Sequence, residues 1–450
     1  MASRRKYEDT HPWISFQLHM DRVLNWDAWS LLGEIRASVR QIASVALRPK
    51  TALALHRLYL AKGVRATTAI EGNTLSEDEV RRILDNELSL PPSKEYLGRE
   101  VRNIEQACDA IWQQAVSGTE SRLNPEKIKQ FNLWVRQGLP TATDEAPPGE
   151  LRTYSVGVGS YRGAPAEDCE HLLRRLCEWL AEPNFAGPPH HATEFAVIRS
   201  IVAHLYMAWI HPFADGNGRT ARLVEFDILI NAGFPTPCAH LLSNHYNETR
   251  SEYYRQLDYA SKSRGDVGPF LRYAIQGMVD GLQTQLRAIG HEQLDIAWRN
   301  FVHEHFGNAN TPARLRQRKL ILELSRQRRH VEFSELAELS SKIAVEYSGK
   351  TSKTLRRDVN ALERDRLLLK HNGKYFPNRF LILAFKPANK DVGLGRITDD
   401  ELDFLFPVQR ADAERTGESM VDLISPDGLG TIESPDDAQR SFNFLSSEED

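Results

Sequence analysis

Residues 211–222 read His211-Pro-Phe-Ala-Asp-Gly-Asn-Gly-Arg-Thr-Ala-Arg222 and join two apolar helical segments. The first segment ends near Ile210, and the second begins at about Asn217 and runs to Asn231. A loop in this position directs free backbone N–H groups and a helix N-terminus towards whatever lies above it. Gly216 and Gly218 lack a Cβ atom, so the backbone can turn tightly and approach a ligand. We therefore expect a loop that can hold phosphate oxygens.

The charged side chains of this loop suit the same purpose. Arg219 and Arg222 lie three positions apart, so both can reach one anion from the first helical turn. Asp215 offers a hard oxygen ligand of the kind that Mg²⁺ takes together with substrate phosphates. His211 can accept a proton near neutral pH. A single histidine at a helix end is more often structural, and a single Gly-Asn-Gly is usually a turn; their combination favours a functional site.

The loop resembles the motif of the Fic family, His-x-Phe-x-Asp/Glu-Gly-Asn-Gly-Arg-x-x-Arg, and matches it at every fixed position. The resemblance extends over roughly Leu53 to Ser261. It implies a Fic-fold helical core and a protein adenylyltransferase, an enzyme that moves AMP from ATP to a Ser, Thr or Tyr hydroxyl of a target protein or of itself. ATP and Mg²⁺ are the implied substrate and metal ion.

The resemblance also implies roles for the residues of the loop. His211 would deprotonate the target hydroxyl, which then attacks the α-phosphate of ATP and expels pyrophosphate. Asp215 would hold Mg²⁺ between the α- and β-phosphates, while Arg219 and Arg222 would stabilise the β- and γ-phosphates. The full set of implied phosphate-binding residues is Gly216, Asn217, Gly218, Arg219 and Arg222.

Two neighbouring segments are similar to further parts of the family's site. Residues 149–165 look like a β-hairpin flap that would clamp the target chain, although an ordinary surface hairpin stays open as an alternative. Residues 246–257 are similar to the segment beside the adenine, where Tyr253 and Tyr254 are either adenine contacts or core aromatics. The flap residues expected to meet the target are Val156, Gly157, Val158 and Gly159.

A second motif lies upstream, in Thr67-Thr-Ala-Ile-Glu-Gly-Asn73. It matches the family's inhibitory pattern, Ser/Thr-x-x-x-Glu-Gly/Asn, and we expect a helix that ends at Glu71. The spacing of four places Thr67 and Glu71 on one helix face. By resemblance, Glu71 would form a salt bridge with Arg222 and so remove the arginine that the γ-phosphate needs. A solvated glutamate is the alternative, and the sequence leaves open whether Glu71 also supports removal of the AMP group.

Composition limits the remaining classes of protein. The chain has 450 residues, of which 41% are hydrophobic and 26% are charged, and these values predict a soluble globular protein. Helical periodicity from Trp26 to about Phe306 predicts a mostly α fold with one hairpin in its core. No apolar stretch reaches the roughly 20 residues of a membrane span. Four cysteines without CxxC spacing indicate buried thiols and a cytoplasmic location. The net charge of −4 argues against nucleic-acid binding along the whole chain.

The chain is expected to contain four regions. Residues 1–95 form an N-terminal helical region, residues 96–306 the catalytic core, residues 311–387 a winged helix-turn-helix domain, and residues 388–450 an acidic, disordered tail. The third region shows helical patterns from Leu315, from Ser334 and from about Thr351, followed by a strand pair around Asn372-Gly373.

The last of these helical patterns resembles the recognition helix of bacterial winged-helix regulators. Lys353, Arg356 and Arg357 would face outward, where they could contact DNA, while the acidic residues Asp358, Glu363 and Asp365 dilute the basic patch. Protein docking or dimerisation is the alternative for this face, and a homodimer stays open.

Two functions compete with the adenylyltransferase interpretation. One is a DNA-binding regulator that uses the Fic fold as a sensor, and the other is a Fic enzyme that transfers another phosphate-linked group.

Overall fold

The computed structural model describes residues 4–118, 122–141, 145–158, 161–308, 311–327, 329–371 and 373–382. The predicted acidic tail, Gly159 and Asn372 lie outside these residues. The chain divides into two compact units, Met1–Ile289 and Gly290–Asp450. The described elements are mainly helices, with two small antiparallel sheets, and the predicted mostly α class is confirmed.

The first unit is built from helices that surround a central pair, α9 and α10. Both are almost entirely buried, and they pack along each other. The helices that begin in this unit are α1 (Lys6–Thr10), α2 (Met20–Val23), α3 (Trp26–Ser44), α4 (Pro49–Ala69), α5 (Glu77–Leu84), α6 (Glu95–Val116), α7 (Pro125–Arg136), α8 (Cys169–Leu180), α9 (Ala192–Ile210), α10 (Asn217–Asn231), α11 (Thr236–Ala239), α12 (Leu241–Glu248), α13 (Arg250–Lys262) and α14 (Gly268–Phe306).

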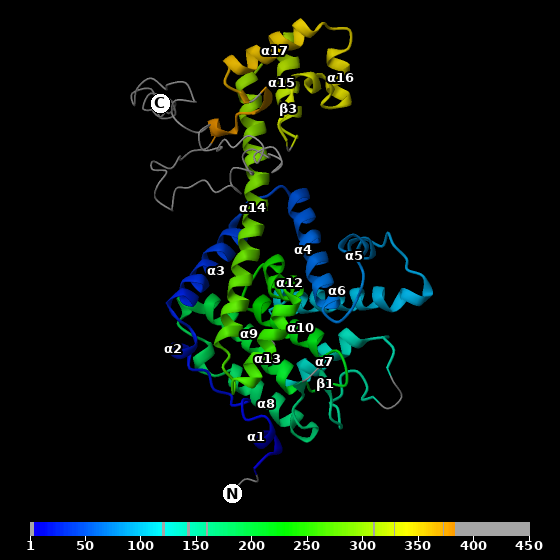
Figure 1. Cartoon of the computed structure of the whole chain (residues 1–450), viewed down its shortest axis with the longest axis vertical. Coiled ribbons are helices and arrows are strands. Elements are labelled where there is room, and N and C mark those ends of the chain that lie inside the picture. The colour runs from blue at the N-terminus through cyan, green and yellow to red at the C-terminus, as the bar shows by residue number, and fades with distance from the viewer. Residues whose placement is uncertain are drawn as a thin grey trace. The chain divides into compact units, whose positions relative to one another are not determined.

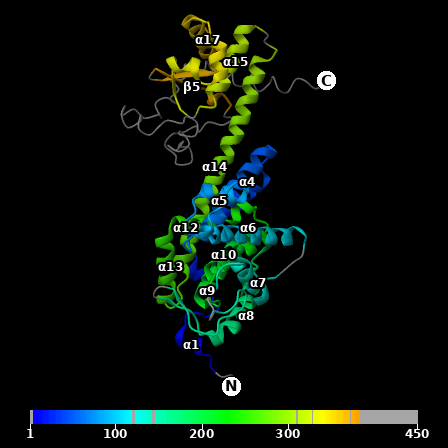
Figure 2. The same ribbon diagram turned by 90° about the vertical axis from the view of Figure 1, so that its right-hand side faces the viewer.

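Other helices enclose the central pair on all sides. α10 packs against α4, α6 and α7, whereas α9 packs against α3 and α8, and both views place α9 and α10 in the middle of the unit (Figure 1; Figure 2). A helix that is apolar around its whole circumference is stable only when it is covered in this way. The predicted bounds of α10 are confirmed, and α9 ends at Ile210 as expected.

The chain around Glu71 differs from the expectation in one respect. α4 ends at Ala69, so Glu71 lies in the turn that follows the helix and not at its last position. The helix stops there because Gly72 adopts a positive φ of 100°, which glycine tolerates and a helix does not contain. The next helix, α5, begins at the capping box that the sequence Ser76-Glu-Asp-Glu79 predicts, with reciprocal hydrogen bonds between Ser76 and Glu79.

The predicted hairpin flap is present but much shorter than expected. Its paired strands are β1 (Gly157–Val158) and β2 (Tyr161–Arg162), in antiparallel register. The short helical turn η2 (Ala166–Asp168) follows and leads into α8. Outside these two strands, the flap is held by individual hydrogen bonds to the rest of the first unit, so its position depends on the surrounding structure.

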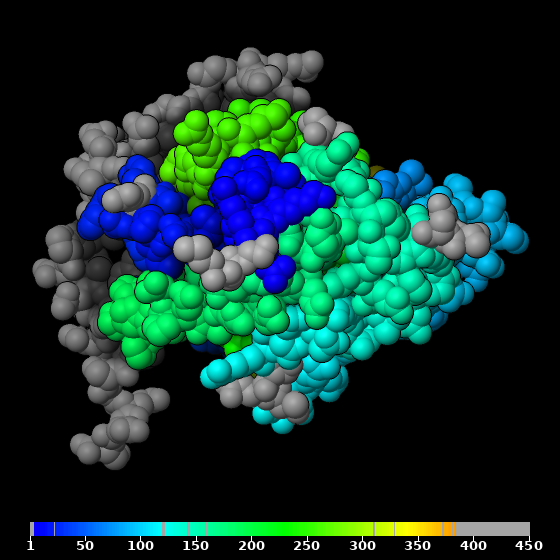
Figure 3. Space-filling model, turned by 90° about the horizontal axis from the view of Figure 1, so that it is seen from below, coloured from blue at the N-terminus to red at the C-terminus, as the bar shows by residue number. Residues whose placement is uncertain are grey.

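An N-terminal arm supports the base of this flap. Arg5 and the backbone N–H of Tyr7 both bind the buried carboxylate of Asp168, at 3.2 and 2.9 Å. Farther along the arm, His11 Nε2 lies 2.8 Å from the carbonyl oxygen of Arg162 in β2. Seen from below, the dark blue N-terminal residues lie beside the turquoise segment that contains these partners (Figure 3). Nothing in the sequence pattern predicted this contact.

The second unit combines three helices with a three-stranded antiparallel sheet in the order β3-β5-β4. Its core includes Ile321, Leu336 and Val359. The expected helix from Ser334 is instead a short 3₁₀ helix, and the regular helix begins after Ser340, whose hydroxyl caps it. The elements are α15 (Pro312–Leu324), β3 (Val331–Glu332), η5 (Phe333–Glu338), α16 (Ser341–Tyr347), α17 (Ser352–Arg364), β4 (Leu368–His371), β5 (Lys374–Pro377) and η6 (Arg379–Ile382).

The remaining short helical turns belong to the first unit and are η1 (Pro92–Lys94), η3 (Pro183–Phe185) and η4 (Pro189–His191). In the described part of the chain, no helix has both the length and the hydropathy that crossing a bilayer needs.

Candidate active site

The loop between α9 and α10 is held in one shape by its own backbone and by Asn217. His211 ends α9 in the left-handed conformation, with φ 50°, and Gly216 precedes α10 with φ 79°. The Asn217 side chain accepts from the N–H of Phe213 at 2.9 Å and donates to its carbonyl oxygen at 2.8 Å. Phe213 itself is buried in the core. The Asn217 amide therefore shapes the loop, and its backbone N–H is left for an anion.

Gly218 is required because a carboxylate occupies the space above it. A Cβ atom at this position would lie 2.1 Å from Oε1 of Glu71. The Glu71 carboxylate thus lies at the N-terminus of α10, where the helix dipole and the free N–H groups favour negative charge. In this structure Glu71 takes the place in which the sequence predicts a phosphate.

Arg222 is the buried partner of that carboxylate. Its Nη2 donates to Glu71 Oε1 at 2.5 Å and to the carbonyl oxygen of Thr67 at 3.0 Å. Thr67 therefore contributes through its backbone. Burial alone would lower the pKa of Arg222, but the charge of Glu71 outweighs it and the pKa is raised. Among the described residues, Nη1 and Nε of Arg222 have no hydrogen-bond partner, so this guanidinium can hold more negative charge than Glu71 supplies.

The same pair determines the charge state of Glu71. Burial favours the protonated carboxyl and raises its pKa, whereas the charge and hydrogen bond of Arg222 lower it; the net pKa lies below the usual value. Glu71 is therefore ionised at physiological pH. Its side chain remains 31% exposed because it borders an open cavity.

Asp215 and Arg219 form a second charged group at the start of α10. Arg219 donates to Asp215 Oδ2 at 3.2 Å and to Glu100 Oε1 at 2.6 Å. Arg136 also binds the Asp215 carboxylate, and the N–H of Gly216 donates to its Oδ1 at 2.6 Å. With 44% of its side chain exposed, Asp215 can present an oxygen to a cation that carries water and phosphate ligands.

Two residues of α7 hold this loop and were not predicted. Asn132 donates to the carbonyl oxygen of Asp215 at 2.9 Å, and Arg136, one turn later, binds the Asp215 carboxylate. Asn132 also accepts from the N–H of Gly149, at the start of the flap segment. Their spacing of four on one helix was the only available signal, and that spacing is common in helices.

Arg152 is the third residue that the sequence reasoning missed. Its buried guanidinium donates to the carbonyl oxygens of His211 at 2.7 Å and of Tyr154 at 2.7 Å. It also donates to the carbonyl oxygen of Ala164, on the other leg of the flap, at 2.5 Å. One side chain therefore joins the end of α9 to both legs of the flap.

The environment of His211 keeps its imidazole neutral. Burial and the positive charge of Arg152 lower the pKa of His211 to about 4. A histidine with this pKa is uncharged at pH 7 and can accept a proton from a hydroxyl group. The structure therefore presents His211 as an acceptor at the mouth of the loop.

A cavity of about 670 Å³ opens beside the loop and is lined on one side by Glu71, His211 and Gly218. Tyr253 and Tyr254 of α13 line its other side, together with Ile70 and Leu257. This combination of an apolar wall and a charged end suits a nucleotide, with the base on the tyrosine side.

The two tyrosines are held differently. Tyr253 is buried, and its hydroxyl lies 2.8 Å from Nε2 of His204. His204 in turn lies 3.1 Å from Glu225, which accepts from the hydroxyl of Tyr246 at 2.9 Å. Tyr254 is 38% exposed, and its hydroxyl donates to the carbonyl oxygen of Ile70 at 3.4 Å. Tyr253 is therefore both a core residue and a wall of the cavity, so the two interpretations of the sequence apply together.

The flap reaches the same cavity through a residue that was not singled out, Tyr161. Its hydroxyl donates to the carbonyl oxygen of Trp209 at 2.8 Å, and its ring lines the cavity. Of the predicted target contacts, Val156 accepts from the N–H of Gly163 at 3.0 Å, and Gly157 and Val158 form β1. Gly159 lies outside the described residues.

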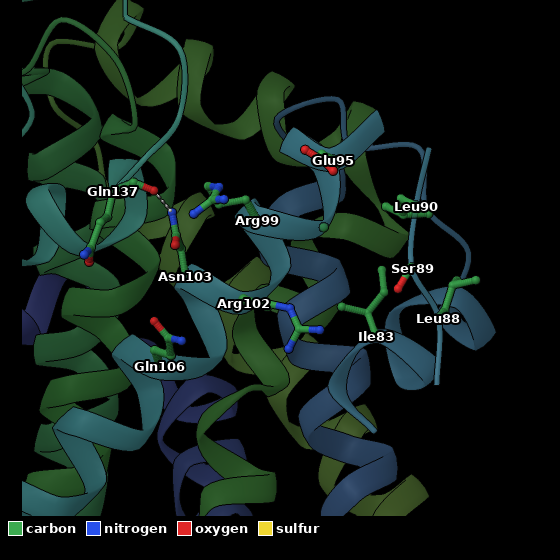
Figure 4. Close-up of a pocket in the computed structure, with 11 residues that line it drawn as sticks. Ile83, Leu88, Ser89, Leu90, Glu95, Arg99, Arg102, Asn103, Gln106 and Gln137 are labelled. Atoms are coloured by element: carbon green, nitrogen blue, oxygen red, sulfur yellow. Dashed lines mark hydrogen bonds between the residues drawn. The ribbon is translucent and has the colours of Figure 1, made fainter. Parts of the chain in front are cut away.

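A second hollow, of about 360 Å³, lies beside α6 and contains none of the predicted site residues. Figure 4 shows Arg99 and Arg102 of α6 in this hollow, with Leu88 and Leu90 on its other side. Glu100, which binds Arg219, belongs to the same helix but does not line the hollow.

The predicted DNA contacts lie in the second unit, on α17. Lys353, Arg356 and Arg357 are exposed, and the guanidinium of Arg356 lies over the ring of Phe333 at 4.5 Å. The expectation that Asp358 dilutes this patch is wrong. Its carboxylate is buried and accepts from Arg316 at 2.8 Å and from Tyr347.

The site residues fit a bound ATP molecule and its metal ion. The unpartnered nitrogens of Arg222, the N–H groups at the start of α10 and the cavity beside them are matched to a polyphosphate and a base. Asp215 supplies one hard oxygen, which is what Mg²⁺ needs when phosphates provide further ligands. Among the described residues, no cluster of three or more potential metal ligands is found, so a metal ion here would depend on the substrate.

Comparison with known proteins places this geometry in context. Residues 122–229 match the model of the Fic/DOC family. The chain is 30% identical over 223 residues to the protein adenylyltransferase fic-1 of Caenorhabditis elegans, which covers 50% of this chain and 40% of the relative. It is 28% identical over 234 residues to the protein adenylyltransferase Fic of Nematostella vectensis, covering 50% of each. The chain thus spans between two fifths and one half of these curated relatives.

A Fic family protein from Desulfovibrio desulfuricans G20 aligns with a TM-score of 0.48 at 20% identity, covering 79% of this chain and 96% of that one. Fic-1 from C. elegans aligns with a TM-score of 0.47 at 27% identity, covering 58% of this chain and 73% of that one.

Proposed function

Because this chain is a Fic family protein, we propose that it is a protein adenylyltransferase that moves AMP from ATP to a Ser, Thr or Tyr hydroxyl of a target protein or of itself. The observation that carries the proposal is the arrangement of a neutral His211 and a buried, incompletely paired Arg222 around one cavity. The two groups are suited to opposite ends of the reaction: one accepts a proton and the other holds a phosphate.

The proposed mechanism assigns one task to each group. His211 accepts the proton of the target hydroxyl while the hydroxyl oxygen bonds to the α-phosphorus, and the bond from that phosphorus to the bridging oxygen of pyrophosphate breaks. Arg219 and Arg222 hold the β- and γ-phosphates, and the N–H groups of Gly218 and its neighbours hold phosphate oxygens. Positioning and charge neutralisation supply most of the acceleration, and general base catalysis contributes roughly 10²–10⁴-fold.

Asp215 is the proposed ligand of the metal ion. Bound Mg²⁺ would neutralise phosphate charge as a Lewis acid. For Asp215 to serve, its carboxylate must exchange at least part of its contact with Arg136 and Arg219. Both arginines can follow the negative charge to the phosphates, so this exchange leaves no cation without a partner.

We propose that Glu71 restrains this reaction. Its carboxylate binds the arginine assigned to the γ-phosphate and fills the space above Gly218. A nucleotide that placed its phosphates on α10 would have to displace a carboxylate from both positions. The displaced Glu71 would remain beside the cavity, where it could also orient water for removal of the AMP group.

The test is transfer of label from ATP in the presence of Mg²⁺. The parent, Glu71→Gly, and Glu71→Gly with His211→Ala would each be incubated with α-labelled and, separately, γ-labelled ATP. We expect protein-bound label from the α-position alone, strongest in Glu71→Gly and lost with His211→Ala. Label from the γ-position would indicate transfer of a phosphate instead. Absence of label in every variant, with or without added lysate, would overturn the proposal.

A second candidate function concerns the unit that begins at Gly290, for which we propose a winged helix-turn-helix domain that binds DNA. The observation in its favour is the burial of Asp358, which leaves segment 350–357 with several exposed cations and no exposed acid. Outward cations on such a helix can reach phosphates or base edges in a major groove. A salt-dependent mobility shift on promoter DNA tests it. Docking to a protein or formation of a homodimer is the alternative proposal for the exposed face of α17. A cytoplasmic location of the protein is a separate proposal.

A further inference from the structure

We propose that Glu100 is a positioning residue that couples Arg219 to the turn carrying Glu71. The inference rests on the proposed restraint by Glu71 and adds a second link to it. Glu100 lies on α6, and its two carboxylate oxygens have different partners. Oε1 accepts from Arg219 at 2.6 Å, and Oε2 accepts from the side chain of Asn73 at 2.9 Å. The Glu100 side chain is only 14% exposed.

Asn73 holds the far end of the turn that carries Glu71. Its side-chain amide donates to Glu100 and to the carbonyl oxygen of Leu97 at 3.1 Å, and its oxygen accepts from the N–H of Leu75. The near end of the turn is held by α4, where the N–H of Glu71 donates to Thr68 at 3.1 Å. Only Gly72 separates Glu71 from Asn73, so an anchor on Asn73 limits where the Glu71 carboxylate can lie.

Arg219 links this anchor to the phosphate site. Its guanidinium is almost fully buried and is shared between Glu100 and Asp215. A phosphate that binds Arg219 competes with Glu100 for the same donors. Once Arg219 has turned to the phosphate, Glu100 loses the contact that holds its carboxylate beside Asn73, and the turn keeps fewer anchors. Binding at Arg219 and release of Glu71 therefore favour each other, and such coupling is reciprocal.

A plain structural role for Glu100 makes a different prediction. If Glu100 only filled space or paired a buried charge, its replacement would change stability, or would change phosphate affinity to the same extent whether or not Glu71 is present. If it acts through the turn, its effect on phosphate affinity requires Glu71. The two roles are separated by repeating each substitution in the Glu71→Gly background.

Two substitutions break the link at different points. Glu100→Gln keeps the size of the side chain but leaves one acceptor oxygen for two donors. Asn73→Asp keeps the acceptor for Leu75 and places a like charge against Glu100, while Asn73 itself makes no hydrogen bond to Arg219. Glu95→Gln is the matched control, because Glu95 lies exposed on the same helix and no hydrogen bond or ion pair is found for it among the described residues.

The measurement is the Kd of ATP by titration calorimetry, for each variant in the parent and in the Glu71→Gly background. In the parent background we expect Glu100→Gln and Asn73→Asp each to tighten ATP binding about fivefold or more, the lower end of typical coupling. The two together should have no larger effect than Glu100→Gln alone. With Glu71→Gly, the effect of Asn73→Asp should vanish, and that of Glu100→Gln should shrink to the part that comes from direct competition for Arg219. Glu95→Gln should have no effect in either background.

Equal shifts in both backgrounds, or no shift in the parent, would overturn the coupling. If Glu100→Gln does not fold, Asn73→Asp alone still measures the coupling, since it keeps both Glu100 and Arg219 in place. Failure of the proposed transferase activity is recognised separately, as Glu71→Gly protein that binds ATP without modifying any protein.

Discussion

The arginines of α10 and the cations of α17 are held in opposite ways. Arg219 and Arg222 are almost fully buried, and each contacts a carboxylate. Lys353 and Arg357 are exposed on the surface of the second unit. A buried charge without a partner is costly, whereas an exposed one is solvated by water. The core must therefore supply a counter-charge whenever no phosphate is bound, and the surface helix need not.

This difference accounts for the place of the proposed restraint in the first unit. Glu71 and Glu100 neutralise two buried arginines, and in doing so they occupy the donors that a polyphosphate would use. An unpaired buried Arg222 would destabilise the fold. The contact between Glu71 and Arg222 therefore serves both the stability of the first unit and the proposed inhibition. The predictions below test the contrast, beginning with the largest expected effect.

Replacing a buried arginine should affect catalysis far more than replacing an exposed one. In the Glu71→Gly background, we expect Arg222→Ala to lower the rate of AMP transfer about 10²–10³-fold, the usual effect of removing one donor to developing negative charge. The measurement is the initial rate with α-labelled ATP. Arg174→Ala, which removes an exposed cation of α8, is the control and should leave the rate unchanged. Comparable losses in both variants would contradict the contrast.

Adding a methyl group at Gly218 should reveal the carboxylate above it. We expect Gly218→Ala to destabilise the parent by about 1–3 kcal/mol, because its Cβ would overlap Glu71 and the core is closely packed. In the Glu71→Gly background the overlap with the carboxylate is gone and the close neighbour left is Nη1 of Arg222 at 3.2 Å, so the loss caused by alanine should be clearly smaller than in the parent.

Denaturant unfolding of all four proteins measures this difference. Gly33→Ala, on α3, serves as a control because a Cβ there meets no atom within 4 Å. An equal loss with and without Glu71 would show that the carboxylate does not occupy this space.

The pH dependence of transfer should reflect the buried position of His211. Since its pKa is lowered to about 4, the neutral form is present above that pH and is lost below it. Because the Glu71 carboxylate itself raises this pKa, we expect kcat/KM of Glu71→Gly to decline only below about pH 4, by roughly tenfold per unit. ATP affinity measured at each pH corrects for protonation of the nucleotide. A decline already centred near pH 6.5 would show a solvated histidine and contradict the assignment.

The smallest effect is expected on α17. If this helix binds DNA, Arg357→Ala should weaken binding to all sequences and reduce the salt slope of the binding constant by about 1. Arg356→Ala should change binding less, because its guanidinium already lies over the ring of Phe333. Mobility shifts at several salt concentrations measure both. A salt-independent complex, or none, would favour a protein-docking surface.

Local sequence patterns predicted a large part of the fold. The bounds of α10, the end of α9 and the capping box before α5 all follow from residues adjacent in sequence, and the structure confirms them. Errors occurred where local rules compete. The helix before Glu71 stops two residues early because Gly72 takes a positive φ, and the helix expected from Ser334 is divided by the cap at Ser340. The region boundaries stay predictions.

The partners of the site residues could not be predicted in the same way. Arg152 and Arg136 hold the loop through hydrogen bonds that join positions far apart in the chain. Asp358 seemed to weaken a basic surface, yet it is buried against Arg316. Spacing along a helix shows which side chains share a face, but it does not show which face another helix covers.

By itself, the sequence determined the chemistry that this chain can perform: a histidine, a carboxylate, two glycines and two arginines on one short loop, and a glutamate motif upstream. The tertiary structure alone decided how those groups are engaged. Glu71 and Arg222 meet because α4 packs against α10, and Glu100 contacts both Arg219 and Asn73 because α6 packs against both helices. The reason is physical: burial gives charges their strength and requires that they be paired, and burial is a property of the packed helices.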